Sequence, residues 1–279
     1  MNLKIIFEDE YIIVCYKPAG IPTQTSKLGE QDMVSLLKNY LYKQQAEDKQ
    51  GGRITAAHSQ ARKKEPYLAV IHRLDQPVEG LLVFAKTPMA AKELSKQMQG
   101  MAENKQVQSK QGSERMQTLE DAGFGKYYKA VLWGVPKELT GTLEDYLVKD
   151  GRTNTSRVCD KNEKDAKKAV LHYEVLVAGK YDEQVGKVNN CPGKNEIATR
   201  DISLVKIKLA TGRHHQIRVQ MANMGCPIWG DAKYNTAPVQ DRRFRQIALC
   251  AYKLEFVHPK TKKAVVFEME PEGEGFRKL

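Results

Sequence analysis

The sequence lacks the features of membrane and secreted proteins. No apolar run approaches the length of a membrane span, and the hydrophobic fraction of 41% is ordinary for a globular chain. Near the N-terminus, Lys4 is followed by a short apolar pair and then by the acidic residues 8–10, which is not a signal-peptide pattern. We therefore expect a cytoplasmic protein that has no membrane partner.

The common metal and cofactor motifs are also missing. There is no His-Glu-x-x-His pair, no Walker loop and no glycine-rich dinucleotide fingerprint. The neighbouring His214 and His215 would point to different faces of a helix, so they do not predict a metal pair. The cysteines are odd in number and form no Cys-x-x-Cys pair, which indicates neither a disulfide framework nor a zinc site. They are Cys15, Cys159, Cys191, Cys226 and Cys250. We expect no metal and no cofactor, and chemistry carried out by side chains alone.

Positive charge, in contrast, is in excess. The formal net charge is +11 and the isoelectric point is near 9.3. Such an excess favours association with a polyanion, and nucleic acid is the commonest one, although the alternative is a merely basic soluble protein. Basic stretches at residues 53–64, 149–168 and 242–245 are candidate contacts, but a charged loop is by default simply solvated.

Short apolar runs separated by turn residues dominate the chain. They predict strands at residues 5–7, 11–16, 68–71, 81–86, 127–133, 169–177, 202–209, 247–256 and 264–268. Helices are expected after the cap Asp32, from Pro88, and over residues 214–224 with Gly225 at the end. Many strands with few helices predict an α+β fold, with a mixed, mostly antiparallel sheet flanked by helices.

Three polar stretches interrupt this pattern, near residues 44–64, 99–124 and 179–200. We expect flexible insertions there, the second part helical and the third a long hairpin. The length of 279 residues fits one large domain, residues 1–279, and nothing demands more than a monomer.

Asp75 is the most informative residue. It follows Arg73 by two positions, precedes the turn-prone Gln76-Pro77, and lies between two apolar runs. A carboxylate held beside positive charge stays ionised, and an ionised, positioned carboxylate can act as a nucleophile. The alternative is an aspartate that simply begins a turn.

Four segments stand out together. They are Glu8-Asp9-Glu10 with Lys17-Pro18-Ala19-Gly20; His72-Arg73-Leu74-Asp75 with Ala85-Lys86-Thr87; Lys126-Tyr127-Tyr128-Lys129-Ala130 with Trp133-Gly134; and Thr211-Gly212-Arg213-His214-His215-Gln216-Ile217-Arg218-Val219 with Gly225-Cys226-Pro227-Ile228-Trp229-Gly230-Asp231 and Lys233-Tyr234. In this order they resemble the motifs of RNA pseudouridine synthases of the RluA type. The resemblance runs from near residue 5 to near residue 268.

The resemblance implies the pseudouridine synthase fold and a reaction that isomerises uridine to pseudouridine in structured rRNA or tRNA, without a cofactor. It makes Asp75 the catalytic aspartate, Tyr128 the residue that stacks on the target base and Arg218 the partner of the aspartate. The target base must be flipped out of the RNA to be reached. Taken singly, Tyr128 is more often a core residue and Arg218 more often a solvated ion-pair partner, so their joint occurrence carries the assignment.

Seven further residues are candidate RNA contacts. They are Lys17, His72, Arg73, Lys86, Arg213, His215 and Gln216. The lysines end strands, where they touch phosphate or are simply solvated, and the histidines are as readily structural hydrogen-bonding groups.

The chain departs from the resembled pattern in several places. Gln76-Pro77-Val78-Glu79-Gly80 stands where Arg-x-Thr-Ser-Gly is common, which is expected to place the negative charge of Glu79 near the site. His214 replaces a usual Thr and Gln220 a usual His. The strands begin almost at Met1, so we expect no N-terminal S4 domain and RNA selection by the catalytic domain itself.

The chemistry that the aspartate performs stays open. It attacks the anomeric carbon of the sugar, adds to the pyrimidine ring, or removes a sugar proton. Two other functions fit part of the sequence: a non-catalytic RNA-binding chaperone on the same fold, and a carboxylate-based nucleosidase. A pure binder would not need Asp75, Tyr128 and Arg218 together. A nucleosidase would not need the +11 charge, and the absence of a second well-placed carboxylate argues against it.

Overall fold

The computed structural model describes residues 3–27, 29–50, 65–103, 123–185, 196–235 and 246–278. The strands are β1 (Lys4–Glu8), β2 (Ile12–Lys17), β3 (Ala69–Val70), β4 (Glu79–Ala85), β5 (Gly125–Trp133), β6 (Thr140–Asp150), β7 (Thr155–Cys159), β8 (Lys167–Val185), β9 (Glu196–Leu209), β10 (Leu249–Val257) and β11 (Ala264–Glu268). The helices are α1 (Met33–Gln50), α2 (Pro88–Glu103), α3 (Gln216–Asn223) and a short 3-10 helix, η3 (Glu274–Lys278).

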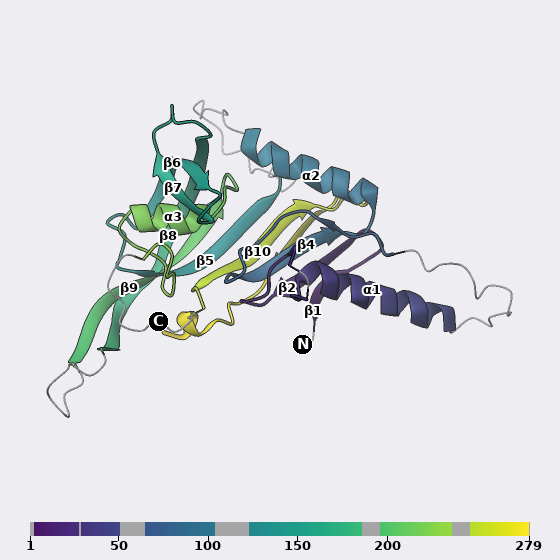
Figure 1. Cartoon of the computed structure of the whole chain (residues 1–279), viewed down its shortest axis with the longest axis horizontal. Helices are drawn as coiled ribbons and strands as arrows, with labels where there is room; N and C mark the ends of the chain where they lie inside the picture. The colour runs from purple at the N-terminus through teal and green to yellow at the C-terminus, as the bar shows by residue number, and fades with distance from the viewer. Residues whose placement is uncertain are drawn as a thin grey trace.

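One sheet runs through the molecule in the order β1-β2-β4-β10-β5-β9-β8-β6-β7, with β3 beside β4 and β11 beside β10. Among the described strands the neighbours are antiparallel, except that β4 and β10 are parallel. The predicted α+β class, with a mixed and mostly antiparallel sheet, is confirmed. Figure 1 shows α1 at one end of the sheet and α3 beside β6 and β7 at the other.

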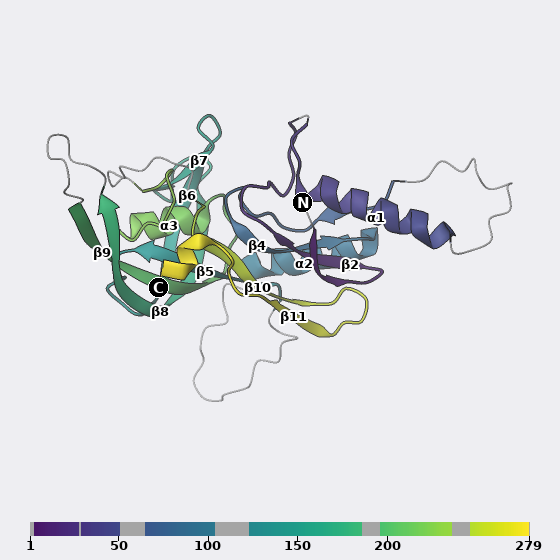
Figure 2. The same cartoon turned by 90° about the horizontal axis from the view of Figure 1, so that it is seen from below.

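The helices cover opposite faces of the sheet. Met33 and Leu37 of α1 share one hydrophobic core with Ile217 and Met221 of α3. Residues of α2, among them Leu94, belong to a second core on the other face. Figure 2 shows α1 and the pair β10–β11 on opposite sides of the view. Because β2 and β4 are buried on both faces, their sequences are continuous apolar runs, as is typical of central strands.

The two halves of the sheet meet at a short parallel junction between β4 and β10. Only Cys250↔Glu79 and Ala251↔Gly80 are paired there in the described part of the chain. Gly80 has φ +130°, and a Cβ on it would lie 2.5 Å from the backbone nitrogen and oxygen of Ala251. A side chain cannot fit at that distance, so the junction requires glycine.

Several boundaries differ from the sequence prediction. The predicted flexible stretch from residue 44 is wrong up to residue 50, because α1 continues to Gln50. The helix expected over residues 214–224 begins at Gln216, since His215 is left-handed with φ 53°. Gly225, with φ +88°, follows that helix as predicted. Residues 149–168, expected to be a basic loop, contain β7 and belong with β6 to a hairpin that the sequence did not predict.

The remaining insertions are described only in part. α2 extends to Glu103, which agrees with a partly helical second insertion. β8 and β9 pair as far as Val185↔Glu196 and form the expected long hairpin, which projects from the sheet in Figure 1. The basic stretches at residues 53–64 and 242–245 lie outside the described residues.

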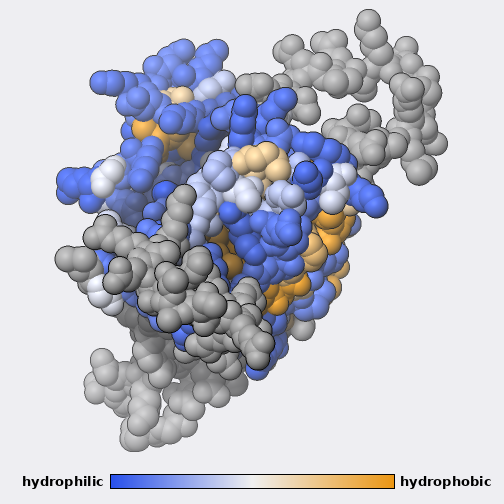
Figure 3. Space-filling model, turned by 90° about the vertical axis from the view of Figure 1, so that its right-hand side faces the viewer, coloured by the Kyte–Doolittle hydropathy of each residue, from blue (hydrophilic) through white to orange (hydrophobic). Residues whose placement is uncertain are grey.

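The exposed surface is mostly hydrophilic on the face that Figure 3 shows, with hydrophobic side chains in small patches. Within the described residues, no helix has the length and apolar character needed to cross a membrane.

The Gly80 junction generates a stability prediction. Gly80→Ala should lower the free energy of unfolding by about 3 kcal/mol, because the methyl group meets the backbone of Ala251 and the residue is held at an unfavourable φ. Urea unfolding measures the change. Gly151→Ala is the control, since its Cβ would meet nothing within 4 Å. Equal effects of the two substitutions would contradict a close approach at the junction.

Candidate active site

A cleft of about 640 Å³ opens on the face of the sheet that carries α1 and α3. Its wall combines the segment between β3 and β4, the cleft-facing side of β5, and the loop from β9 into α3. Asp75, Tyr128 and Arg218, which are far apart in the sequence, all line it. The three residues that the sequence singled out are therefore brought together.

Hydrogen bonds to residues 74–78 hold the Asp75 segment in place. The Thr23 hydroxyl donates to the carbonyl of Leu74 at 3.0 Å and accepts from its backbone nitrogen at 3.1 Å. The buried ammonium of Lys17 donates to the carbonyl of Gln76 at 3.0 Å. The turn closes through the Val78 nitrogen and the Asp75 carbonyl at 3.0 Å. The carboxylate of Asp75 is thus held in place, with 29% of its side chain exposed to the cleft.

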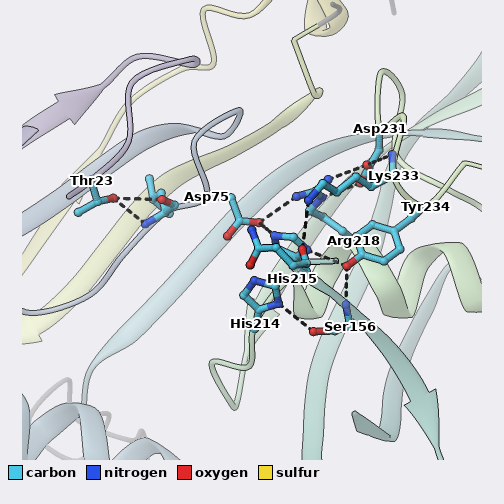
Figure 4. A network of polar contacts seen from close by, with 11 residues as sticks. Thr23, Asp75, Ser156, His214, His215, Arg218, Asp231, Lys233 and Tyr234 are labelled. Carbon is cyan, nitrogen blue, oxygen red and sulfur yellow. Dashed lines mark hydrogen bonds and ion pairs between the residues drawn. The ribbon is translucent and has the colours of Figure 1, made fainter. Parts of the chain in front are cut away.

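Arg218 is held between two carboxylates (Figure 4). Nε and Nη2 donate to the two oxygens of Asp231 at 2.7 and 2.8 Å, and Nη1 donates to Oδ2 of Asp75 at 3.3 Å. Both Arg218 and Asp231 are almost fully buried, at 3% and 1% exposure. Burial works against the charge of the guanidinium, but the hydrogen bonds and charge of Asp231, together with Asp75, outweigh it and raise the pKa of Arg218. Asp231 therefore fixes the guanidinium, and the remaining donor faces Asp75.

His215 reaches Asp75 from the other side. Its Nε2 lies 3.5 Å from Oδ2 of Asp75, and its Nδ1 lies 2.7 Å from the hydroxyl of Tyr234. That hydroxyl also accepts from the backbone nitrogen of Ser156 at 2.8 Å. Burial, and next the charge of Arg218, lower the pKa of His215 to about 3, so the ring is neutral near pH 7. Because a carboxylate only accepts hydrogen bonds, the neutral ring satisfies both neighbours with its hydrogen on Nε2, toward Asp75, and with Nδ1 accepting from the Tyr234 hydroxyl.

His214 joins this arrangement to the hairpin of β6 and β7. Its ring stacks on His215 with centroids 3.8 Å apart, and its Nδ1 lies 2.9 Å from the hydroxyl of Ser156 in β7. Figure 4 shows these side chains on one side of Asp75, opposite Thr23. The hairpin that the sequence missed therefore supports the site.

β5 supplies the deep wall of the cleft. Tyr128 is 6% exposed, and burial raises the pKa of its hydroxyl above the ordinary value, with the charge of Asp75 adding to the effect. The phenol is neutral near pH 7, and its ring belongs to the core on the cleft face. Lys126, two residues earlier, lines the same cleft.

The structure separates the predicted RNA contacts into two groups. Arg73, Arg213, His215, Gln216 and His72 line the cleft. Lys17 and Lys86 are not among its lining residues.

Within the first group, Arg73 is exposed and hydrogen-bonds only to Gln24 among the described residues. Arg213 donates through Nε to the carbonyl of Lys168, which leaves the other guanidinium nitrogens beside the cleft. Gln216 is buried and braces the loop through Val170, Thr211 and Arg213. These positions make the two arginines the stronger candidates for phosphate contact.

His72, Lys17 and Lys86 have structural partners instead. His72 is buried and accepts from the Val83 nitrogen at 3.3 Å. The Lys17 ammonium is fully buried and donates to the carbonyls of Pro18, Ile21 and Gln76, so the expectation that it touches phosphate is wrong for this conformation. Lys86 pairs with Glu8 at 2.6 Å, outside the cleft.

The expected negative charge from Glu79 is absent from the cleft. On β4, Glu79 alternates with Leu81 and Val83 and shares their face, opposite the cleft. It accepts from the Tyr16 hydroxyl at 2.6 Å and from the Gly273 nitrogen at 2.9 Å. The prediction that Glu79 adds charge beside Asp75 is wrong, because the residue anchors the C-terminal segment.

Sequence reasoning assigned no role to Asp231, Tyr234 or Thr23. Asp231 and Tyr234 lie in the fourth of the motif segments, but nothing in their spacing shows that they contact Arg218 and His215. In the described ranges, no group of three or more His, Cys, Asp or Glu residues is arranged to hold a metal ion.

Comparison with known proteins places this geometry in a family. The family model for RNA pseudouridylate synthase matches residues 11–223. The chain belongs to this family. The predicted resemblance to RluA-type synthases, and with it an isomerase that acts on RNA, is confirmed.

The curated relatives span nearly the whole chain. An uncharacterized RNA pseudouridine synthase of Bacillus subtilis is 27% identical over 96% of this chain and 68% of its own length. The ribosomal large subunit pseudouridine synthase D of Zymomonas mobilis is 29% identical over 96% of this chain and 69% of its own. The tRNA pseudouridine synthase C of Vibrio cholerae is 27% identical over 95% and 89%.

A solved structure shares the fold of the synthase. Human RNA pseudouridylate synthase domain containing 1 superposes with a TM-score of 0.63 at 19% identity, over 97% of this chain and 84% of that one.

The buried ion pair in this synthase yields a stability prediction. Asp231→Asn should lower the free energy of unfolding by about 3 kcal/mol, because Arg218 stays buried after losing its bidentate carboxylate. Glu163→Gln is the matched control: Glu163 is also bidentate to an arginine, Arg157, but that pair is exposed to solvent, so its loss should lower stability much less. Denaturant unfolding of both variants tests this. A loss of similar size in the two would show that burial of the Arg218 pair has no energetic consequence.

The buried histidines predict acid sensitivity. Burial lowers the pKa of His72 and of His215 to about 3, from 6.5. Between these values the unfolded chain binds protons that the folded chain excludes, so the free energy of unfolding decreases as the pH falls, by up to about 1.4 kcal/mol per pH unit for each group. In His72→Asn one fewer proton is taken up on unfolding, so the slope of the free energy of unfolding against pH should be smaller by up to about 1.4 kcal/mol per pH unit. Urea unfolding from about pH 7 to about pH 4 measures it, and an unchanged slope would mean that His72 is protonated in the folded state.

Proposed function

We propose that this synthase isomerises specific uridines to pseudouridine in structured rRNA or tRNA, with Asp75 as the catalytic carboxylate. The observation that carries the proposal is that Asp75 is the one carboxylate among the described residues that line the cleft, and that an immobilised arginine faces it. The names of relatives that act on large-subunit rRNA and on tRNA support these substrate classes. The reaction is proposed to need no metal and no cofactor, in a single catalytic domain that works as a monomer in the cytoplasm.

The reaction breaks the bond between C1′ of the ribose and N1 of uracil and forms a bond between C1′ and C5. In the three routes open to Asp75, attack on C1′, addition to the ring or removal of a sugar proton, the carboxylate has to be ionised and aimed. Arg218, fixed by Asp231, aims it at 3.3 Å. Because the guanidinium is already ordered, no reorganisation is needed when the substrate arrives.

Tyr128 is proposed to stack on the target base. Its ring lies in the cleft wall, and a base stacked on an aromatic ring gains roughly 1–3 kcal/mol. A base that reaches this depth must leave its RNA helix, so base flipping is part of the proposal. Arg73 and Arg213 border the cleft and are proposed to hold the phosphates on either side of the flipped nucleotide.

A non-catalytic RNA chaperone is disfavoured by the same carboxylate. Asp75 repels phosphate, so a protein that only bound RNA would gain nothing from placing it, partly exposed, inside a basic cleft. A nucleosidase of the glycosidase type would use a second carboxylate in the cleft. Among the described lining residues there is none besides Asp75.

The decisive experiment maps pseudouridine in rRNA and tRNA from cells that lack this protein, complemented with wild type or with Asp75→Asn. We expect one or a few sites to disappear in the deletion and to return only with wild type. On transcripts of the identified RNA, Asp75→Asn should lower the rate by at least about a thousandfold while RNA affinity is retained, because the substitution removes the reacting charge but little surface.

Asp201→Asn is the matched control. Asp201 is exposed on β9, so this substitution removes the same charge outside the cleft. It should restore every site that wild type restores. Full activity of Asp75→Asn would overturn the assignment of the carboxylate. If no site is lost in the deletion and purified wild type leaves unmodified rRNA and tRNA transcripts unchanged, the proposed function is wrong.

A further inference from the structure

Lys126 is a buried cation to which the described residues offer no partner. It is 6% exposed and lies two residues before Tyr128 on β5, so both side chains project from the same face of the strand into the cleft wall. No hydrogen bond or ion pair joins its ammonium to any residue that the structure describes. Burying a charge without a partner is costly, so this position calls for a reason.

The neighbouring lysine on the strand behaves differently. Lys129 points to the opposite face, pairs with Glu270 at 2.7 Å and lies over the ring of Tyr252. The contrast indicates that the isolation of Lys126 belongs to its place in the cleft and not to β5 as a whole.

The ammonium of Lys126 lies at the surface of the cleft. A Cβ on Gly212 would be 2.8 Å from Nζ, so the ammonium rests against the exposed backbone of that glycine. The stem is buried beside Leu209, which pairs with Lys126 in the sheet and also lines the cleft. A molecule in the cleft can therefore reach Nζ, while bulk water is largely kept from it.

We propose that Lys126 is a further catalytic residue, whose ammonium donates a hydrogen bond to a carbonyl oxygen of the flipped uracil and stabilises the negative charge that the base acquires during isomerisation. This inference rests on the proposed function.

The depth of Lys126 favours the base over a phosphate as its ligand. Lys126 and Tyr128 are equally buried, and a base stacked on Tyr128 would bring its edge beside the adjacent side chain on the strand. A phosphate is strongly hydrated and belongs at the rim, where the exposed Arg73 is available.

In each chemical route the base acquires negative charge, which the ammonium can stabilise. When the C1′–N1 bond breaks, its electron pair stays on uracil and the charge spreads over N1, O2 and O4; C5 then bonds to C1′ and loses its proton. If Asp75 first adds to the ring, the electron pair of the C5–C6 double bond moves toward O4 instead. A donor on a carbonyl oxygen stabilises either anion more than it stabilises neutral uracil, and such a difference between the two states is what raises a rate.

Lys126→Met tests the proposal on the RNA identified by the mapping experiment, under single-turnover conditions. We expect the rate of pseudouridine formation to fall about 10²- to 10³-fold, as for loss of a donor to a developing oxyanion. RNA affinity should change less than about threefold, and thermal stability should not fall, because the substitution removes a desolvated charge and keeps most of the volume. Lys129→Met removes the same charge from the other face and should keep the wild-type rate.

The pH profile separates a catalytic ammonium from a structural one. Burial lowers the pKa of Lys126 to about 8, so kcat/KM of wild type should decline above about pH 8, and Lys126→Arg should restore the rate and move that decline to higher pH. The other titratable groups that line the cleft are His72, Arg73, Asp75, Tyr128, Lys149, Arg213, His214, His215 and Arg218. The pKa values of His72 and His215 are lowered to about 3, and those of Tyr128 and Arg218 are raised, so these four do not titrate near pH 8. Lys17, whose pKa burial lowers to about 7, is present in every variant and would give a decline that Lys126→Arg does not move.

Two results would overturn the inference while leaving the proposed function intact: a Lys126→Met rate within about threefold of wild type, or a loss of rate matched by an equal loss of RNA affinity or by a lower melting temperature. If wild type itself makes no pseudouridine on any transcript, the proposed function fails, and this inference fails with it.

Discussion

The buried guanidinium of Arg218 is the interaction on which the site depends. Burying a charge at 3% exposure is costly without partners, and Arg218 has two: Asp231, which binds two of its nitrogens, and Asp75, which binds a third. Asp75 belongs to the segment before β4 and Arg218 to α3, which packs beside β6 and β7. One side chain therefore joins the two halves of the sheet across the cleft and orients the carboxylate of Asp75 at the same time.

The sheet keeps these partners at the required separation. β4 and β10 meet through two residue pairs, and the glycine at that junction lets the two backbones approach more closely than any side chain would permit. Asp75 lies five residues before Gly80, and β5, with Tyr128 and Lys126, is the next strand beyond β10. The position of Asp75 relative to the wall of the cleft that β5 forms is set by strand pairing, which is stiffer than a loop and would suit a site that has to be ordered before substrate binds.

The sequence predicted the strands whose burial leaves a pattern of apolar residues. It did not predict the features that depend on contacts between distant residues. β2 and β4 are buried on both faces, so their apolar runs identified them, whereas β6 alternates between exposed and half-buried residues and was missed. Asp75, Tyr128 and Arg218 were found through motif order. The role of Asp231 was not, because an aspartate after a turn looks the same whether it is solvated or bound to a buried arginine.

Lys17 and Glu79 were assigned to the site from the sequence, but their contacts in the structure show that they do not belong to it. Both are charged residues beside motif segments, and both were read as part of an RNA-facing site. The lysine instead donates hydrogen bonds to three backbone carbonyls beside the Asp75 segment. The glutamate accepts hydrogen bonds from the Tyr16 hydroxyl and the Gly273 nitrogen on the face of the sheet opposite the cleft. A single residue of register decides whether a strand side chain faces the cleft or its reverse, and that register is set by the whole sheet.

The charges around the cleft are arranged so that one carboxylate remains available. Asp231 is saturated by Arg218 and Glu79 is turned away, so Asp75 is the acidic group that a molecule in the described part of the cleft can meet. His215, held neutral beside it, adds a donor without adding a second positive charge. Three cations of the cleft lining, Arg73 and Arg213 near the rim and Lys126 deeper in the wall, pair with no carboxylate among the described residues. In the proposed reaction, polyanion binding and chemistry on the base would be separated by depth: positive charge at the rim would meet phosphate, and the few buried polar groups, which cost stability, would lie beside the reacting atoms of a flipped base.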